Sequence, residues 1–126
     1  MQSLNLINRH ILVVEDEDLN WYLLRDMIEM YNGIAIHADT GMKAIDIVKN
    51  SKDIDLVLID LNLPFMSGAE ATLEIKQIRP DLTIIAQTAF AEPEMLSKAM
   101  KAGCSGYILK PIEFNELIKI FETHLD

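Results

Sequence analysis

The chain has 126 residues, which is enough for one domain with its own hydrophobic core and too few for two. Its formal net charge of -9 argues against non-specific binding to nucleic acid or to anionic lipid. The single cysteine, Cys104, rules out an internal disulfide and fits a reducing compartment. The sequence has no secretory signal pattern and no apolar run near about 18 residues, so we predict a cytoplasmic domain.

The first part of the chain alternates between strand and helix patterns. The N-terminal segment 1–8 is short and polar and is predicted to be disordered, so the domain is expected to span residues 9–126. A strand is predicted at 10–14, and the acidic residues that follow suit the N-terminus of a helix at 19–31. That helix is expected to bury a broad arc of its surface, made of Leu19, Leu23, Leu24, Met27, Ile28 and Met30.

The central part of the chain contains the pattern that decides the fold class. A strand at 34–38 and a helix at 41–50 are predicted, and Asp39-Thr40 is expected to supply the N-cap of the helix. An unbroken apolar run then leads into Asp60, and Pro64 shortly after it cannot continue a strand. Such a run, at 56–60, is typical of a strand that is buried on both faces of a parallel sheet.

The last part of the chain repeats the alternation. A helix at 68–79 stops at Pro80, a strand follows at 82–88, and Pro93 suits the first turn of a helix at 92–102. A strand at 106–109 and a helix at 112–124 complete the pattern. Five strand–helix units predict an α/β fold, a doubly wound five-stranded parallel sheet with five helices. The last helix is expected to bury Phe114, Leu117, Ile118 and Phe121.

Polar side chains follow four of the predicted strands: Glu15 and Asp16, Asp60, Thr88, and Lys110. If the strands are parallel, these ends meet at one edge of the sheet, where open α/β sheets bind ligands. Three carboxylates at one place repel one another unless one is protonated or a cation neutralises them, and Mg²⁺ prefers such oxygen ligands. A lysine ammonium and a hydroxyl beside them suit a phosphoryl oxygen. The pattern therefore indicates a site for a phosphoryl group on Asp60.

With these residues in view, the chain resembles a receiver domain of a two-component response regulator or of a hybrid sensor kinase. The resemblance covers nearly the whole chain in the right order and spacing. It rests on Glu15-Asp16, on Asp60 with Pro64 and Gly68 behind it, on Thr88-Ala89, and on residues 102–111.

The resemblance implies a flavodoxin-like strand order of 2-1-3-4-5. It also implies phosphorylation of Asp60 by a histidine kinase or a histidine phosphotransfer protein. Mg²⁺ would be held by Asp16, Asp60 and the backbone carbonyl of Asn62. Many family members have aspartate at the position of Glu15, whose longer side chain is expected to reach the metal through water. Lys110 would contact the phosphoryl group.

The resemblance further implies a conformational switch. Pro111 would follow a cis peptide bond, and Thr88 and Tyr107 would move together. The fourth helix, fifth strand and fifth helix would then present a changed face to an output protein or domain. Such a domain accepts and loses its own phosphoryl group and is not a multiple-turnover enzyme on another substrate. We expect neither nucleic acid nor a membrane as a partner.

Three other functions place different demands on these residues. A Mg²⁺-dependent phosphatase of the haloacid dehalogenase type needs a second aspartate two residues after the first, where this chain has Asn62. A flavodoxin-like electron carrier needs a phosphate loop after the first strand, where the acidic residues 15–18 would repel phosphate. A phosphorylation-independent pseudo-receiver stays an alternative, although Asp60, Thr88 and Lys110 are all intact.

The histidines and two of the acids receive ordinary interpretations. His10, His37 and His124 are scattered along the chain and are interpreted as surface or strand histidines. Glu17 and Asp18 are interpreted as solvated acids of a first helical turn.

Overall fold

The computed structural model describes residues 4–90 and 92–125, and within them five strands alternate with five helices. The strands are β1 (His10–Val14), β2 (Ile34–Ala38), β3 (Ile54–Asp60), β4 (Thr83–Thr88) and β5 (Gly106–Leu109). The helices are α1 (Asp18–Met30), α2 (Gly41–Asn50), α3 (Gly68–Ile78), α4 (Pro93–Ala102) and α5 (Phe114–Leu125). The alternation predicted from the sequence is therefore confirmed.

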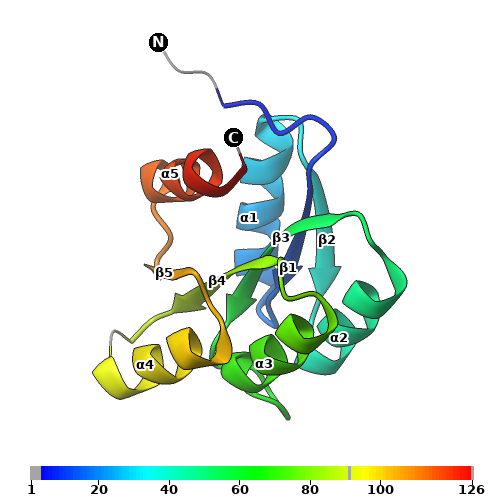
Figure 1. Cartoon of the computed structure of the whole chain (residues 1–126). Helices are drawn as coiled ribbons and strands as arrows, with labels where there is room; N and C mark the ends of the chain where they lie inside the picture. The colour runs from blue at the N-terminus through cyan, green and yellow to red at the C-terminus, as the bar shows by residue number, and fades with distance from the viewer. Residues whose placement is uncertain (1–3, 91, 126) are drawn as a thin grey trace.

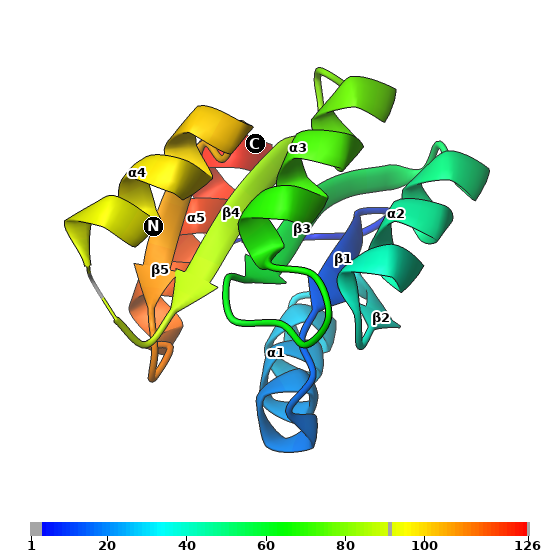
Figure 2. The same ribbon diagram turned by 90° about the horizontal axis from the view of Figure 1, so that it is seen from below.

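All five strands form one parallel sheet in the order β2-β1-β3-β4-β5. Figure 1 shows α1 and α5 on one face of this sheet and α2, α3 and α4 on the other. The same two layers are visible in Figure 2, where α2, α3 and α4 lie in front of the strands. The predicted flavodoxin-like order is confirmed, and the order reverses between β1 and β3. In such sheets the ligand site lies at this reversal, outside the carboxyl ends of the strands.

The central strand β3 contributes to two hydrophobic cores. Leu56 and Leu58 pack under α1 and α5, whereas Val57 and Ile59 pack under α2, α3 and α4. All four side chains are fully buried. Side chains of a strand alternate between its faces, so a strand covered on both faces must be apolar at every position. This burial explains the unbroken apolar run that leads into Asp60.

Helix ends are fixed by local hydrogen bonds. The Ser67 hydroxyl accepts the Glu70 N–H at 3.1 Å, and the Glu70 carboxylate accepts the Ser67 N–H in return, which makes a capping box at the start of α3. Thr40 caps α2 as predicted, accepting the Lys43 N–H at 3.1 Å. Among the described residues, no helix is both long enough and apolar enough to span a membrane.

Helix α1 buries a narrower stripe than the sequence predicted. Leu24, Met27 and Ile28 are buried, but Leu19 is 83% exposed, and Leu23 and Met30 are exposed as well. Successive residues of a helix are about 100° apart, which places the buried three on one side and the others beside them. The prediction that all six side chains are buried is therefore wrong for half of them.

Helix α5 differs from the prediction in the same way. Leu117 and Phe121 are buried as expected and Leu125 joins them, but Phe114 at the first position is 37% exposed. Phe114 instead lies against the ring of Tyr31, with ring centroids 5.9 Å apart. Ile118 is half-buried at the edge of the core.

The segment before β1 packs against the domain. Leu4 and Leu6 are buried in the core under α1 and α5, and the Leu6 N–H donates to the Tyr31 carbonyl at 2.7 Å. Residues 4–8 thus differ from the expected disordered segment, while residues 1–3 lie outside the described residues. Burial of these two leucines and the Leu6–Tyr31 hydrogen bond attach this stretch to the domain.

Candidate functional site

Three carboxylates meet at the carboxyl edge of the sheet, where the strand order reverses. Glu15 follows β1, Asp16 comes next, and Asp60 ends β3. One carboxylate oxygen from each lies within 4.8 Å of the other two. Glu15 is fully buried, Asp60 is 4% exposed and Asp16 is exposed. The structure therefore brings together the three acids that the sequence predicted as one cluster.

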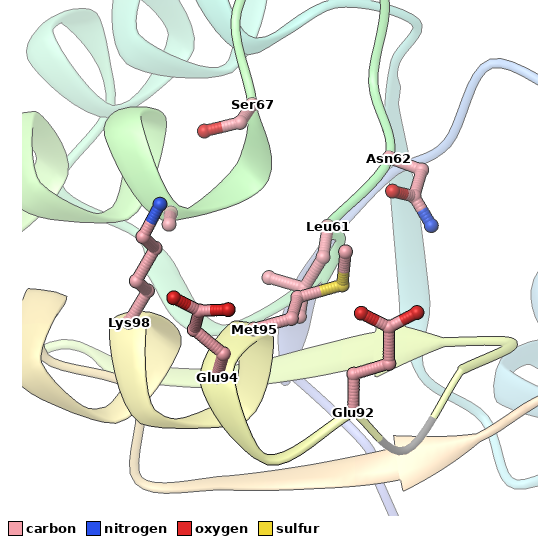
Figure 3. A pocket seen from close by; sticks show the side chains of 8 residues that line it. Leu61, Asn62, Ser67, Glu92, Glu94, Met95 and Lys98 are labelled. Carbon is pink, nitrogen blue, oxygen red and sulfur yellow. The ribbon is translucent and has the colours of Figure 1, made fainter.

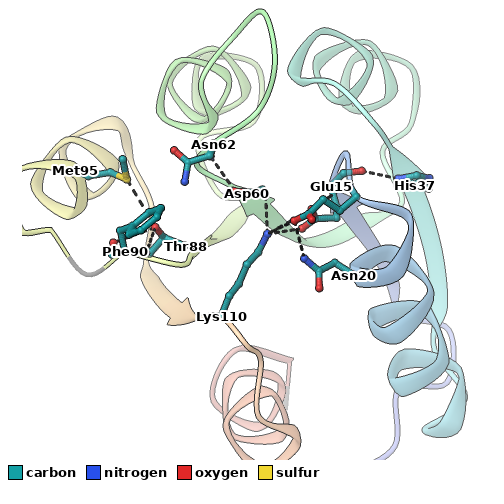
Figure 4. Close-up of polar contacts among 10 residues, drawn as sticks. Glu15, Asn20, His37, Asp60, Asn62, Thr88, Phe90, Met95 and Lys110 are labelled. Atoms are coloured by element: carbon teal, nitrogen blue, oxygen red, sulfur yellow. Dashed lines mark hydrogen bonds and ion pairs between the residues drawn. The ribbon is translucent and has the colours of Figure 1, made fainter.

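Lys110 extends into this cluster from the loop after β5, as Figure 4 shows. Its Nζ lies 2.7 Å from Asp60 Oδ2 and 3.0 Å from Glu15 Oε2. The ammonium group therefore offsets the repulsion between the two buried carboxylates. The Lys110–Pro111 peptide bond is cis, as the family resemblance implied.

Burial and neighbouring charges change the proton affinities of this pair. Burial raises the pKa of Glu15 to about 7, with Lys110 opposing the change and the Asp60 charge adding to it. Burial also opposes the charged form of Lys110, but its hydrogen bonds to Asp60 and Glu15 prevail and raise its pKa. The lysine is therefore a cation across the neutral pH range, while Glu15 can take up a proton within it.

The loop after β3 holds the other oxygen of Asp60. The Asn62 N–H donates to Asp60 Oδ1 at 2.9 Å, while Lys110 binds Oδ2. The Gly68 N–H donates to the Leu61 carbonyl at 3.1 Å, which folds the loop back against the end of β3. The Asp60 carboxylate is thus oriented from two sides.

Thr88 and Tyr107 lie on the two strands beyond β3. The Thr88 hydroxyl is buried, donates to the Phe90 carbonyl at 3.0 Å and accepts the Phe90 N–H at 3.1 Å. It also lies 3.7 Å from the Met95 sulfur, so its partners belong to the α4 side and not to the acid cluster. Tyr107 is 46% exposed on β5. Tyr107 pairs in register with Ala86 on β4, so neither residue belongs to the acid cluster.

Two cavities open near the cluster. One of about 240 Å³ is lined by Asp16, Glu17, Asp60 and Lys110 and is bounded by Asn62, Ala89 and Phe90. The other, of about 320 Å³, lies between the β3–α3 loop and α4 (Figure 3). Leu61 and Met95 line the second cavity together with the acids Glu92 and Glu94. The first cavity gives a small group access to Asp60.

His37 lies on β2, in agreement with its interpretation as a strand histidine, but the sequence did not predict its contacts. His37 Nε2 lies 2.8 Å from the Glu15 carbonyl oxygen, and its ring is stacked on Trp21 with centroids 4.3 Å apart. The register of β1 with β2 pairs His37 with Val13, two residues before Glu15. The predicted parallel pairing of β2 with β1 could have indicated this contact, because it places the end of β2 beside the end of β1.

Gln87 is a second residue whose position the sequence did not predict. It is fully buried, and neither its amide nitrogen nor its amide oxygen has a hydrogen-bond partner within residues 4–90 and 92–125. Gln87 is the register partner of Asp60 on β4. A buried side-chain amide without a hydrogen-bond partner is unusual, and the residue that carries this one is paired with a member of the acid cluster.

Comparison with known proteins agrees with this geometry. Residues 11–122 match the family model described as the response regulator receiver domain. The chain is 38% identical over 105 residues to the chemotaxis protein CheY of Halobacterium salinarum, covering 83% of this chain and 87% of that protein. It is 34% identical over 120 residues to the polar-differentiation response regulator DivK of Brucella anthropi, covering 93% and 96%.

Solved structures show the same fold. The receiver domain of a sensor histidine kinase from Pseudomonas aeruginosa, with a magnesium ion coordinated in its active-site cleft, matches with a TM-score of 0.85 at 28% identity, covering 92% of this chain and 96% of that one. A CheY-like receiver domain protein from Methanospirillum hungatei matches with a TM-score of 0.86 at 26% identity, covering 96% and 93%. The chain belongs to the response regulator receiver domain family of two-component signalling.

Proposed function

We propose that this receiver domain accepts a phosphoryl group on Asp60 from the phosphohistidine of a histidine kinase or histidine phosphotransfer protein. The observation that carries the proposal is the environment of Asp60. Its carboxylate ends the central strand, is held by the Asn62 N–H and Lys110, and lies below a cavity of about 240 Å³. A nucleophile held in this way can meet an incoming phosphorus atom with its orientation already set.

The donor set fits a magnesium ion. Carboxylate oxygens of Glu15, Asp16 and Asp60 within 4.8 Å of one another are hard ligands, and the exposed Asp16 leaves room for water ligands. Asp16, Asp60 and the Asn62 backbone carbonyl would hold the ion, and Glu15 would reach it through water. A bound Mg²⁺ would offset the negative charge of the carboxylates and the incoming phosphoryl group.

The chain's own residues then account for the transfer. An oxygen of Asp60 forms the new bond to phosphorus as the bond from phosphorus to the donor's histidine nitrogen breaks, and the electron pair stays on that nitrogen. Lys110 exchanges its contact with Asp60 Oδ2 for one with a phosphoryl oxygen. Two residues after Asp60 the side chain is the amide of Asn62, which supplies no carboxylic acid to carry protons. That amide favours an acceptor domain over an enzyme that turns over another substrate.

The switch begins at Thr88. A phosphoryl group on Asp60 offers the Thr88 hydroxyl an acceptor that competes with the Phe90 carbonyl. If the hydroxyl turns inward, the chain that joins Phe90 to α4 must follow, and Tyr107 can occupy the space released (Ala91 in this stretch lies outside the described residues). Phosphorylation would thus favour one of two states, and α4, β5 and α5 would present the changed face to an output partner.

The acceptor is tested by incubating the protein with Mg²⁺ and acetyl phosphate or phosphoramidate. The intact mass should rise by one phosphoryl group in the wild type and in Asp53→Asn, an exposed control. It should not rise in Asp60→Asn. Labelling of Asp60→Asn at the wild-type rate would refute Asp60 as the acceptor.

A further inference from the structure

Two aromatic rings from different elements meet beside the acid cluster. His37 lies on β2 and Trp21 in the first half of α1, and their rings are stacked with centroids 4.3 Å apart and planes 6° from parallel. We call His37 and Trp21 the ring pair. Each member also makes one hydrogen bond to the loop between β1 and α1, which carries Glu15 and Asp16.

The first hydrogen bond fixes the start of that loop. The Glu15 N–H donates to the Ala38 carbonyl at 3.0 Å, and the Glu15 carbonyl lies 2.8 Å from His37 Nε2. Because a carbonyl oxygen can only accept, Nε2 must carry the hydrogen in this contact. Both peptide groups that flank the Glu15 Cα are therefore hydrogen-bonded to β2, one to the Ala38 carbonyl and the other to the His37 side chain.

The second hydrogen bond fixes the end of the loop. The Trp21 backbone N–H donates to the Glu17 carbonyl at 3.0 Å. Inside the loop, the Glu17 N–H donates to Glu15 Oε1 at 3.2 Å. Asp16 is thus the single residue between two anchored carbonyls, and the stacked rings join the two anchors to each other.

We infer that His37 of the ring pair positions Asp16: its Nε2–H holds the Glu15 carbonyl, so that the Asp16 carboxylate points toward the Asp60 cluster, and Trp21 stacks on the donating ring. His37 acts through the loop and is a positioning residue. The inference rests on the proposed function because it assigns a role in cation binding. Partners that orient a metal ligand from outside the coordination shell contribute about tenfold or more to affinity.

The chain offers substitutions that separate the donor from the ring. His37→Phe keeps a ring to stack on Trp21 but removes the N–H donor. His37→Gln keeps an N–H donor at similar reach and removes the aromatic ring. His124→Phe, on α5, is the matched control because it makes the same chemical change on another element.

Calorimetric titration with MgCl₂ alone measures the first expectation. His37→Phe should bind Mg²⁺ about tenfold more weakly than the wild type, His37→Gln should recover most of that loss, and His124→Phe should match the wild type. Urea midpoints are measured in parallel to identify variants that are simply less folded. Wild-type affinity in a folded His37→Phe, or a folded His37→Gln no better than His37→Phe, would overturn the inference.

Amide hydrogen exchange without added Mg²⁺ supplies a second readout that needs neither metal nor phosphoryl group. The Glu15 and Glu17 amides, which donate to the Ala38 carbonyl and to Glu15 Oε1, should exchange about tenfold faster in His37→Phe, while amides in β3 and β4 stay at wild-type rates. Unchanged exchange at both amides would overturn the inference even if phosphorylation of Asp60 succeeds. Failure of the wild type to take up a phosphoryl group would instead count against the proposed function. The exchange result would still decide whether His37 positions the loop that carries Asp16.

Discussion

At the scale of single residues, the pKa of the Glu15 carboxyl group lies far above its value in water. Its carboxyl group is fully buried, and burial raises its pKa from 4.5 to about 7. Lys110 offsets this change only in part, since its ammonium is shared with Asp60. A protonation change near neutral pH is therefore located next to the proposed phosphorylation site.

This pKa gives a direction for the dependence of stability on pH. Between pH 4.5 and about 7 the folded protein binds a proton at Glu15 that the unfolded chain releases, so the free energy of unfolding should fall as pH rises through this window. Above about pH 7 both states have lost the proton and this contribution is constant. Urea unfolding without divalent cations should show the fall in the wild type and a weaker one in Glu15→Gln.

The control for this measurement is Glu17→Gln, because the Glu17 side chain is 67% exposed. Its pH profile should follow that of the wild type. Equal slopes for Glu15→Gln and the wild type across pH 4.5 to 7 would show that another group causes the dependence.

At the scale of elements, the approach of α3 to β3 fixes the geometry around Asp60. A Cβ on Gly68 would overlap the Asp60 carbonyl oxygen and come within 2.8 Å of the Leu61 Cα. The atoms it would meet are backbone, which cannot turn away as a flexible side chain can. Helix α3 can therefore begin this close to the end of β3 only with glycine at position 68.

Gly68→Ala should destabilise the domain by about 1–3 kcal/mol, the usual cost of forcing extra atoms into a packed site. Phosphorylation of Asp60 should also slow, because the clash displaces the backbone that carries it. The control is Gly106→Ala, where the new Cβ would meet only Ile85 Cδ1 at an ordinary 3.8 Å. Urea unfolding and phosphorylation rates measure both effects, and similar losses in the two variants would contradict this account.

The sequence predicted elements better than it predicted their faces. Strand β3 was recognisable because a strand buried on both faces needs an unbroken apolar run. Since the strands are parallel, their carboxyl ends lie at one edge of the sheet, which brings Glu15, Asp16, Asp60 and Lys110 together. The faces of α1 and α5 were less predictable. Leu19 and Phe114 are as apolar as the buried residues, and only the position of the sheet leaves them exposed.

At the scale of the whole molecule, contacts between distant parts of the chain were beyond local patterns. The segment containing Leu4 and Leu6 is recognised as part of the core only once α1 and α5 are in place. The contact of His37 with the Glu15 carbonyl joins positions 22 residues apart and depends on the pairing of β2 with β1. Local sequence patterns predict neither contact, and only the predicted pairing of β2 with β1 places His37 near Glu15.

The proposed switch is also a property of the whole molecule, because it links Asp60 to a face formed by α4, β5 and α5. Beryllofluoride with Mg²⁺, which mimics the phosphoryl group, should change amide exchange in residues 92–106 of the wild type. Thr88→Ala should still be phosphorylated but should not show this change, since the hydroxyl that responds to the phosphoryl group is gone. Changes confined to α2 in the wild type would place the output face elsewhere.

The stacking of Trp21 on His37 has a practical consequence. Trp21 is the chain's only tryptophan, so all of its indole fluorescence comes from one ring beside the loop that carries Glu15 and Asp16. Indole emission responds to a stacked neighbour and to nearby charge. The protein therefore contains its own optical reporter beside this loop, and events there can be followed in real time without an attached dye.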